Sequence, residues 1–155
     1  MDSTVYTSRG VRALVLLHER HLREFLETWR AAKAANLSLP ETKDPSYASL
    51  ETLLRHVLRA ARGYVVWTCE NLGLADPAIR ATPEPEAIEA EAETYLEHLL
   101  ARWRVSLVEL DDERLEHAEF RSPWGATYCI DGMLEHAVMH PIRHAFQLAE
   151  LLAAR

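Results

Sequence analysis

Apolar residues recur every three or four positions along four long stretches of the chain, the spacing of one face of an α-helix. Breakers such as Pro40, Pro45 and Gly73 separate these stretches. No alternating apolar and polar run exceeds a few residues, so strands are not predicted as major elements. The pattern predicts helices over about residues 8–35, 47–72, 84–110 and 128–154.

Candidate capping residues stand before these stretches, and two of them precede a proline that suits a first helical turn. The candidate N-caps are Asp44, Ser46 or Ser49 for the second helix, Thr82 for the third and Thr127 for the fourth. The polar residues 113–125 are expected to hold a short extended piece or a turn. Four amphipathic helices predict an all-α fold, a four-helix bundle in which residues 1–155 form a single domain. The connections before the second and fourth helices leave room for a crossover.

Composition excludes several classes of function. The 155 residues are 48% hydrophobic and 26% charged, with a formal net charge of −7, which argues against nucleic acid and against an anionic membrane surface. No apolar run reaches the roughly 20 residues that span a bilayer, and the N-terminus shows no secretory signal. Cys69 and Cys129 are expected to be small hydrophobes without a disulfide. We therefore expect a cytoplasmic protein with no membrane partner.

Three of the eight histidines, His136, His140 and His144, are spaced four apart on the last predicted helix. Each step of four residues advances only about 40° around a helix, so the three rings share an arc of roughly 80°. This arc borders the apolar stripe and faces the interior of the bundle or its mouth. Because buried imidazoles need partners and histidine is the commonest metal ligand, the pattern favours a metal site.

His56 on the second helix is the best candidate for a ligand from another element. It shares a helical face with Ala60 and Gly63, whose small size leaves space beside it. Neutral imidazoles from two helices would leave an open coordination position. The alternative is a lone histidine at the edge of the core with a backbone partner. The chain has no H-E-x-x-H and no E-x-x-H, which excludes the zinc-protease helix and the di-iron carboxylate bundles.

Three local patterns resemble the DinB/YfiT-like family of metal-dependent four-helix-bundle proteins. Residues 53–58 read Leu-Leu-Arg-His-Val-Leu, with Trp67 eleven positions after His56; residues 122–125 read Ser-Pro-Trp-Gly before the last helix. Residues 134–147 contain an H-x-x-x-H-x-x-Q ending. The resemblance implies that His56, His140 and His144 are the metal ligands. It makes His136 a neighbouring pocket residue and Gln147 a group that supports a ligand.

The chain departs from that family pattern at two places. Ala145 and Phe146 stand where the family commonly has Arg-Gly, and Pro141 lies between the two ligands of the last helix. Two further residues are candidates from the sequence itself. Trp124 lies in a loop and is a candidate pocket residue, and His18 lies on the apolar stripe of the first helix. A core position is the alternative for His18.

The functional expectation is a metal-dependent enzyme that binds one divalent ion, with zinc, nickel, iron and manganese all open, and acts on a small-molecule substrate. A three-histidine site with an open position could activate a bound water, as in a hydrolase. The resemblance implies a transferase that uses a low-molecular-weight thiol as cosubstrate, and a homodimer. The alternative is a non-catalytic metal-binding or stress-response protein. The sequence offers no acid or base near the metal, because Glu135 turns about 100° away from His136.

Overall fold

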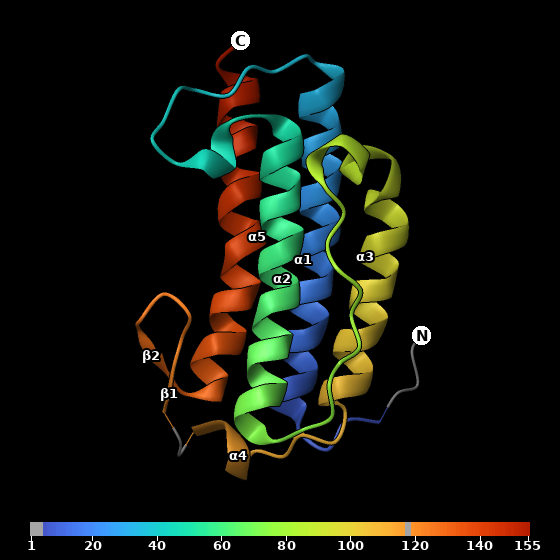
Figure 1. The fold of residues 1–155 in the computed structure, drawn as a ribbon, viewed down its shortest axis with the longest axis vertical. Helices are drawn as coiled ribbons and strands as arrows, with labels where there is room; N and C mark the ends of the chain where they lie inside the picture. Colours follow the sequence, from blue (N-terminus) through green and yellow to red (C-terminus); the bar gives the residue numbers. More distant parts are fainter. Residues whose placement is uncertain (1–4, 117–118) are drawn as a thin grey trace.

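Helices make up most of the molecule (Figure 1), a computed structural model that describes residues 5–116 and 119–155. This confirms the prediction of an all-α fold in its general form. The elements in chain order are α1 (Arg9–Ala34), the 3-10 turn η1 (Pro45–Tyr47), α2 (Leu50–Leu72), α3 (Pro85–Leu107), α4 (Glu113–Glu116), β1 (Phe120–Arg121), β2 (Thr127–Tyr128) and α5 (Ile130–Ala153).

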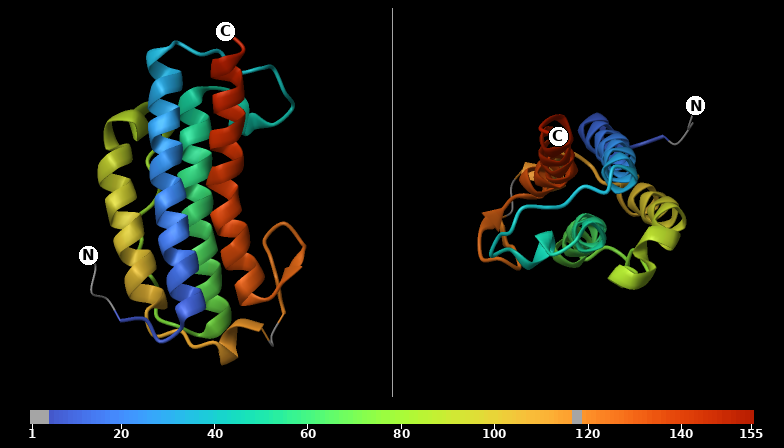
Figure 2. Two further views of the ribbon diagram at one scale, coloured as in Figure 1. Left: turned by 180° about the vertical axis from the view of Figure 1, so that it is seen from behind. Right: turned by 90° about the horizontal axis from the view of Figure 1, so that it is seen from above.

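The four long helices lie side by side, as the view along their axes shows (Figure 2). α1 packs along α5, and α2 contacts both α3 and α5. α1 and α5 run in one direction, and α2 and α3 run in the other. The connection of residues 73–84 therefore runs back along the length of the molecule, so that α3 starts beside the start of α2. The sequence left room for a crossover before the second or the fourth predicted helix. The connection that crosses the length of the molecule instead joins α2 to α3.

Local capping chemistry sets several helix ends. Ser8 and Ser49 are the N-caps of α1 and α2, and each hydroxyl accepts a hydrogen bond from the backbone N–H three residues on. Asp44 caps η1, accepting from the backbone N–H of Ser46 at 2.9 Å. Gly73 ends α2 with φ +63°, a left-handed conformation that glycine adopts without strain. The predicted second helix therefore divides into η1 and α2.

Two predicted helix starts are wrong. Thr127 belongs to β2, and the N-cap of α5 is Cys129, whose Sγ accepts from the backbone N–H of Gly132 at 3.3 Å. α3 begins at Pro85 after Glu84, which makes no side-chain capping bond, rather than after Thr82. The chain can start α3 this way because Pro85 has no N–H to satisfy and its φ suits a first turn.

Two buried tryptophans join the helices through their indole groups. Trp29 on α1 donates from Nε1 to the carbonyl of Leu50 at 2.6 Å, and Trp103 on α3 donates to the carbonyl of Ala61 at 3.0 Å. Both side chains are fully buried in the core that runs between the long helices.

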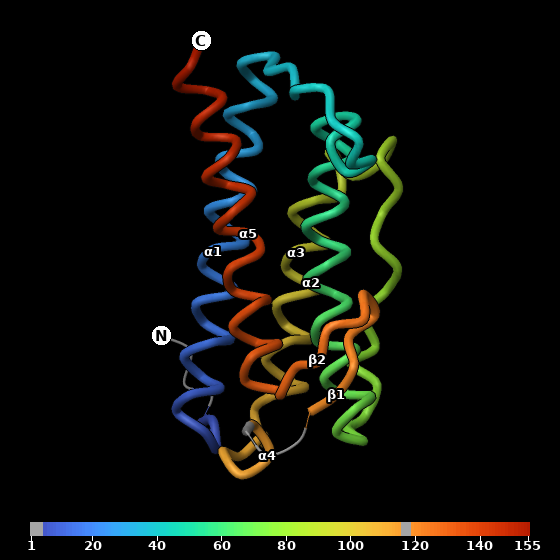
Figure 3. The backbone as a smooth tube through the Cα atoms, turned by 90° about the vertical axis from the view of Figure 1, so that its left-hand side faces the viewer, coloured from blue at the N-terminus to red at the C-terminus, as the bar shows by residue number. Residues whose placement is uncertain are grey.

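A small hairpin lies beside the lower part of α2 and α5 (Figure 3). β1 and β2 pair antiparallel, Phe120 opposite Tyr128 and Arg121 opposite Thr127. Trp67 of α2 donates from Nε1 to the carbonyl of Arg121 at 3.0 Å, which fixes the hairpin against the helix. Within residues 113–125, the expected short extended piece is thus present as β1, together with α4. The loop of the hairpin carries Trp124.

Candidate metal centre

Three histidines from two helices converge between α2 and α5. One ring nitrogen of each of His56, His140 and His144 lies within 4.8 Å of the other two, and together they could hold a metal ion. The Nε2 atoms of His56 and His140 are 3.1 Å apart. α5 continues through Pro141, and His140 and His144 still face the same centre. The expected ligand set is thus close together in space.

The spacing of one pair of these nitrogens matches that of two ligands on a divalent ion. A tetrahedral zinc ion with Zn–N bonds of about 2.0–2.1 Å separates its ligand nitrogens by about 3.4 Å. The 3.1 Å between His56 and His140 is near that value. Nε2 of His144 is buried and has no hydrogen-bond partner among the described residues. A buried nitrogen lone pair without a donor is unfavourable, and a metal ion would satisfy it.

The other nitrogen of His144 is held by a hydrogen-bonded chain that the sequence did not predict. Tyr47 of η1 lies with its hydroxyl 3.0 Å from Nδ1 of His144 and donates its proton to Oε1 of Gln147. Since the single hydroxyl proton goes to Gln147, the hydroxyl oxygen accepts from Nδ1–H of His144. This arrangement leaves the lone pair on Nε2, the tautomer that a ligand needs. Gln147 therefore supports the candidate ligand through Tyr47, and its own side chain also interacts with His144.

The neighbouring residue of η1 contacts a second histidine of the cluster. Oγ of Ser46 is 3.2 Å from Nδ1 of His56, so one turn of 3-10 helix contacts the non-converging nitrogen of two rings. Asp44 and Pro45 fix the start of that turn. Hydrogen bonds of this kind orient metal-binding imidazoles in proteins. Nδ1 of His140 is buried and has no such partner among the described residues.

Burial keeps the three rings neutral. It lowers the pKa of His140 to about 2 and that of His144 to about 4, and the neighbouring imidazole of His56 and the guanidinium of Arg143 add to both shifts. Burial also lowers the pKa of His56. Neutral imidazole is the form that coordinates a metal.

His136 and Trp124 lie next to the cluster; Trp124 lines the adjoining cavity, and His136 packs on Trp124 without belonging to the lining among the described residues. Their rings stack with centroids 5.3 Å apart, and the ring of His136 is 6.5 Å from that of His140. Trp124, with His56 and His140, lines a cavity of about 320 Å³ between α2 and the hairpin loop. The cluster therefore opens onto a pocket.

His18 lies elsewhere, in the core. Its ring packs on Trp103 with centroids 4.1 Å apart, and it belongs neither to the converging histidines nor to the pocket lining among the described residues. Burial lowers its pKa to about 3. Both of its ring nitrogens lack a hydrogen-bond partner among those residues. The alternative prediction for His18, a core position, is therefore the one that the structure supports.

Sequence reasoning missed several residues of this region. Tyr64 and Trp67 of α2 belong to the buried core and also line the cavity. Both lie on the same helical face as His56, eight and eleven positions on, and that spacing was the available signal. Tyr47 lies 97 residues before His144, and nothing local connects the two.

Comparison with family models finds no matching family, and comparisons with curated proteins and with solved structures find no match. The resemblance to the DinB/YfiT-like family therefore stays a prediction, as do the homodimer and the cytoplasmic location. No helix in the described ranges is long and apolar enough to cross a bilayer. The centre is interpreted from its own geometry.

Proposed function

We propose that this chain is a four-helix-bundle metalloenzyme of the DinB/YfiT-like kind, with one divalent ion held by His56, His140 and His144. The ion would lower the pKa of a coordinated water or thiol and so supply a nucleophile at neutral pH. The proposed reaction is attack on a small electrophile, as in a hydrolase or a low-molecular-weight-thiol transferase.

One observation carries the catalytic interpretation: two of the three candidate ligands line the cavity beside the hairpin. A structural zinc site is normally closed by four protein ligands, whereas a catalytic site keeps one position for water or substrate. The described residues offer three ligands and an open side. The long helices also bury their own extensive core, so the fold does not depend on a metal as small metal-dependent domains do.

The residues around the cluster have separate tasks in this proposal. Tyr47 holds His144 in the coordinating tautomer, and Ser46 positions the ring of His56 through its contact with Nδ1. Trp124 covers the pocket from the hairpin loop and limits access of bulk water. No carboxylate lines the pocket among the described residues, so the proton donors available there are neutral side chains.

The test uses protein purified without a nickel column. Metal content is measured by plasma mass spectrometry for the natural chain and for His140→Ala and His144→Ala. We expect about one divalent ion per chain, and strong loss of the ion in both variants. His21→Ala is the control, because His21 pairs with Glu24 on α1 and lies outside the cluster.

Turnover is then measured on metal-loaded and chelated protein, with simple esters and with electrophiles plus low-molecular-weight thiols. A chelated protein that keeps its helical circular dichroism and loses a measurable rate supports the proposal. Unfolding on chelation with no turnover in any assay would overturn it in favour of a structural ion.

A further inference from the structure

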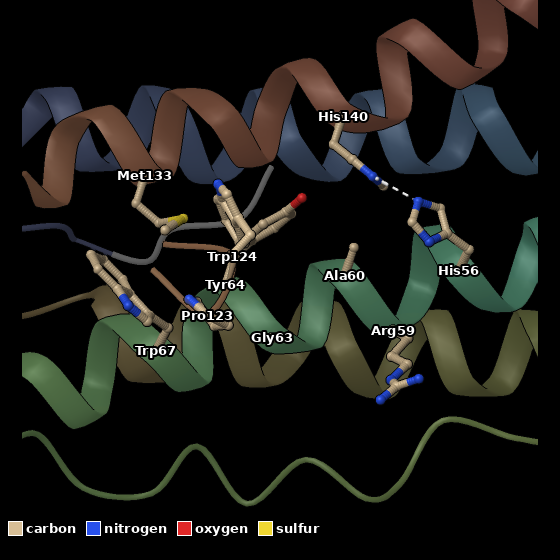
Figure 4. Close-up of a pocket in the computed structure, with 10 residues that line it drawn as sticks. All are labelled: His56, Arg59, Ala60, Gly63, Tyr64, Trp67, Pro123, Trp124, Met133 and His140. Atoms are coloured by element: carbon tan, nitrogen blue, oxygen red, sulfur yellow. Dashed lines mark hydrogen bonds between the residues drawn. The ribbon is translucent and has the colours of Figure 1, made fainter. Parts of the chain in front are cut away.

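The cavity beside the histidines has two chemically different ends (Figure 4). His56 and His140 lie at one end, and Trp67 and Met133 lie at the other. Its volume of about 320 Å³ is at the lower limit of pockets that bind small molecules. A molecule lying along it would place one end at the metal centre and the other among apolar side chains.

Aromatic rings form the walls of this cavity, which we call the aromatic pocket. Its lining residues are His56, Arg59, Ala60, Gly63, Tyr64, Trp67, Pro123, Trp124, Met133 and His140. The rings of Tyr64 and Trp124 meet edge to face, with centroids 6.3 Å apart and planes at 86°. The ring of Trp124 also stacks on the ring of His136. Trp67 uses its N–H on the hairpin, so it offers the pocket only its ring.

The charges around the aromatic pocket disfavour a cationic body. No carboxylate lines it among the described residues, so a cationic group would find no counterion there. A divalent ion at the histidine end would repel a cation further. Among the described residues, Arg59 is the only charged one in the lining; it is exposed and directs its guanidinium away from the histidine end. Arg143 adds positive charge near Tyr64 and His140 from outside the lining. An uncharged planar group fits these walls best, because rings stack on and pack edgewise against other rings.

One hydroxyl near the histidine end is available to a ligand. The Tyr64 side chain is buried, its ring is 5.8 Å from that of His140, and no described residue hydrogen-bonds to its hydroxyl. Its oxygen points away from α2 toward α5 (Figure 4). A phenol is protonated at neutral pH, so this hydroxyl can donate a hydrogen bond to a ligand.

We propose that the aromatic pocket binds an uncharged aromatic ring of the substrate, with a polar substituent at the histidine end that accepts a hydrogen bond from Tyr64. The ring lies among Tyr64, Trp124 and Trp67. The role of this ring in catalysis rests on the proposed function, whereas its binding rests on the pocket alone.

The probe is acetophenone, a small ring that carries one carbonyl group. Its binding is followed through the indole N–H signals of ¹⁵N-labelled protein. The signals of Trp67 and Trp124 should move on titration. Those of Trp29 and Trp103 should stay, because both indoles are buried and bonded to backbone carbonyls away from the pocket. Movement of all four signals alike, or of neither pocket signal, would overturn the proposal.

Ligand chemistry is tested with probes of the same size. Cyclohexyl methyl ketone keeps the carbonyl but lacks the planar ring, and benzylammonium and benzoate add a charge of either sign. Each should bind at least several-fold more weakly than acetophenone. Equal or tighter binding of the saturated ketone would refute recognition of an aromatic ring. Tighter binding of benzoate would refute the uncharged class and make Arg59 an anion anchor.

Gly63 permits a variant that fills the pocket without disturbing the core. A Cβ added there would meet no atom within 4 Å. Gly63→Leu should therefore keep helicity and metal content and reduce acetophenone affinity at least tenfold. Ala31→Leu, at an exposed position of α1, is the matched control and should leave affinity unchanged. Unchanged affinity in a folded Gly63→Leu protein would place the probe elsewhere.

The Tyr64 hydroxyl is tested by Tyr64→Phe. Acetophenone affinity should fall about 2- to 10-fold, the usual range for one hydrogen bond. Binding of ethylbenzene, which has no acceptor, should not change; an equal loss for both probes would overturn the hydrogen bond. All titrations are repeated on chelated protein. If the protein binds the ring but takes up no metal, the proposed function is refuted and this inference stands. If it takes up metal but does not bind the ring, this inference is refuted and the proposed function stands.

Discussion

Replacing Tyr47 with phenylalanine tests whether η1 prepares the histidines for a metal. The change removes one oxygen, which accepts from Nδ1 of His144 and donates to Gln147. The ring remains half-buried where it is. Without the hydroxyl, His144 can place its proton on Nε2, and that tautomer cannot coordinate.

The expected loss in metal affinity follows from this geometry. Removing a hydrogen-bond partner of a metal-binding imidazole typically weakens metal binding by about 10- to 100-fold. That corresponds to about 1.4–2.8 kcal/mol. The folded metal-free protein should lose less, about 0.5–1.5 kcal/mol for one hydrogen bond. The effect of Tyr47→Phe should therefore be larger on metal binding than on unfolding.

The assay is a zinc titration against a competing chelator, paired with urea unfolding of the metal-free protein. Tyr128→Phe is the matched control, because Tyr128 packs on Trp124 and His136 without a hydrogen bond to the three ligands. An unchanged zinc affinity in Tyr47→Phe, or an equal loss in Tyr128→Phe, would refute the idea that Tyr47 sets the tautomer.

Three further predictions concern stability. Chelation should leave the far-ultraviolet circular dichroism unchanged and lower the melting temperature only as far as the lost binding energy requires. Ser49→Ala should lower the free energy of unfolding by about 1 kcal/mol in urea, since it removes the N-cap of α2. Because burial lowers the pKa of His18 to about 3, the unfolded chain takes up a proton below pH 6.5 that the folded chain does not, and stability falls as pH falls. In melts between pH 7 and 5, His18→Leu should reduce that slope by up to about 1.4 kcal/mol per pH unit.

The long helices could be predicted because their apolar spacing is a local property. Ser8 and Gly73 act through bonds within a few residues, so the sequence identifies those ends correctly. The start of α3 could not be found that way, because no side chain caps it. The lengthwise path of residues 73–84 depends on how α3 packs against α2, and no local pattern encodes it.

The histidines also differ in how far local spacing predicts their positions. His140 and His144 are one helical turn apart, so their shared direction follows from the sequence, and the structure adds that His56 meets them. His18 shows the limit of such reasoning. A position on an apolar stripe guarantees burial, but it does not say whether the neighbour is the metal centre or, as here, Trp103.

Two residues that are unfavourable inside helices lie beside the proposed site. Glycine in a helix interior costs about 1 kcal/mol relative to alanine, and proline about 3 kcal/mol. Gly63 is in the middle of α2, and Pro141 separates the two candidate ligands of α5. Local choices that oppose the fold are expected mainly at functional sites. Gly63 is the more informative of the two, because its backbone is helical and an added Cβ would meet no neighbour. Neither the backbone conformation nor core packing requires glycine at position 63. A larger side chain there would occupy the space of the aromatic pocket.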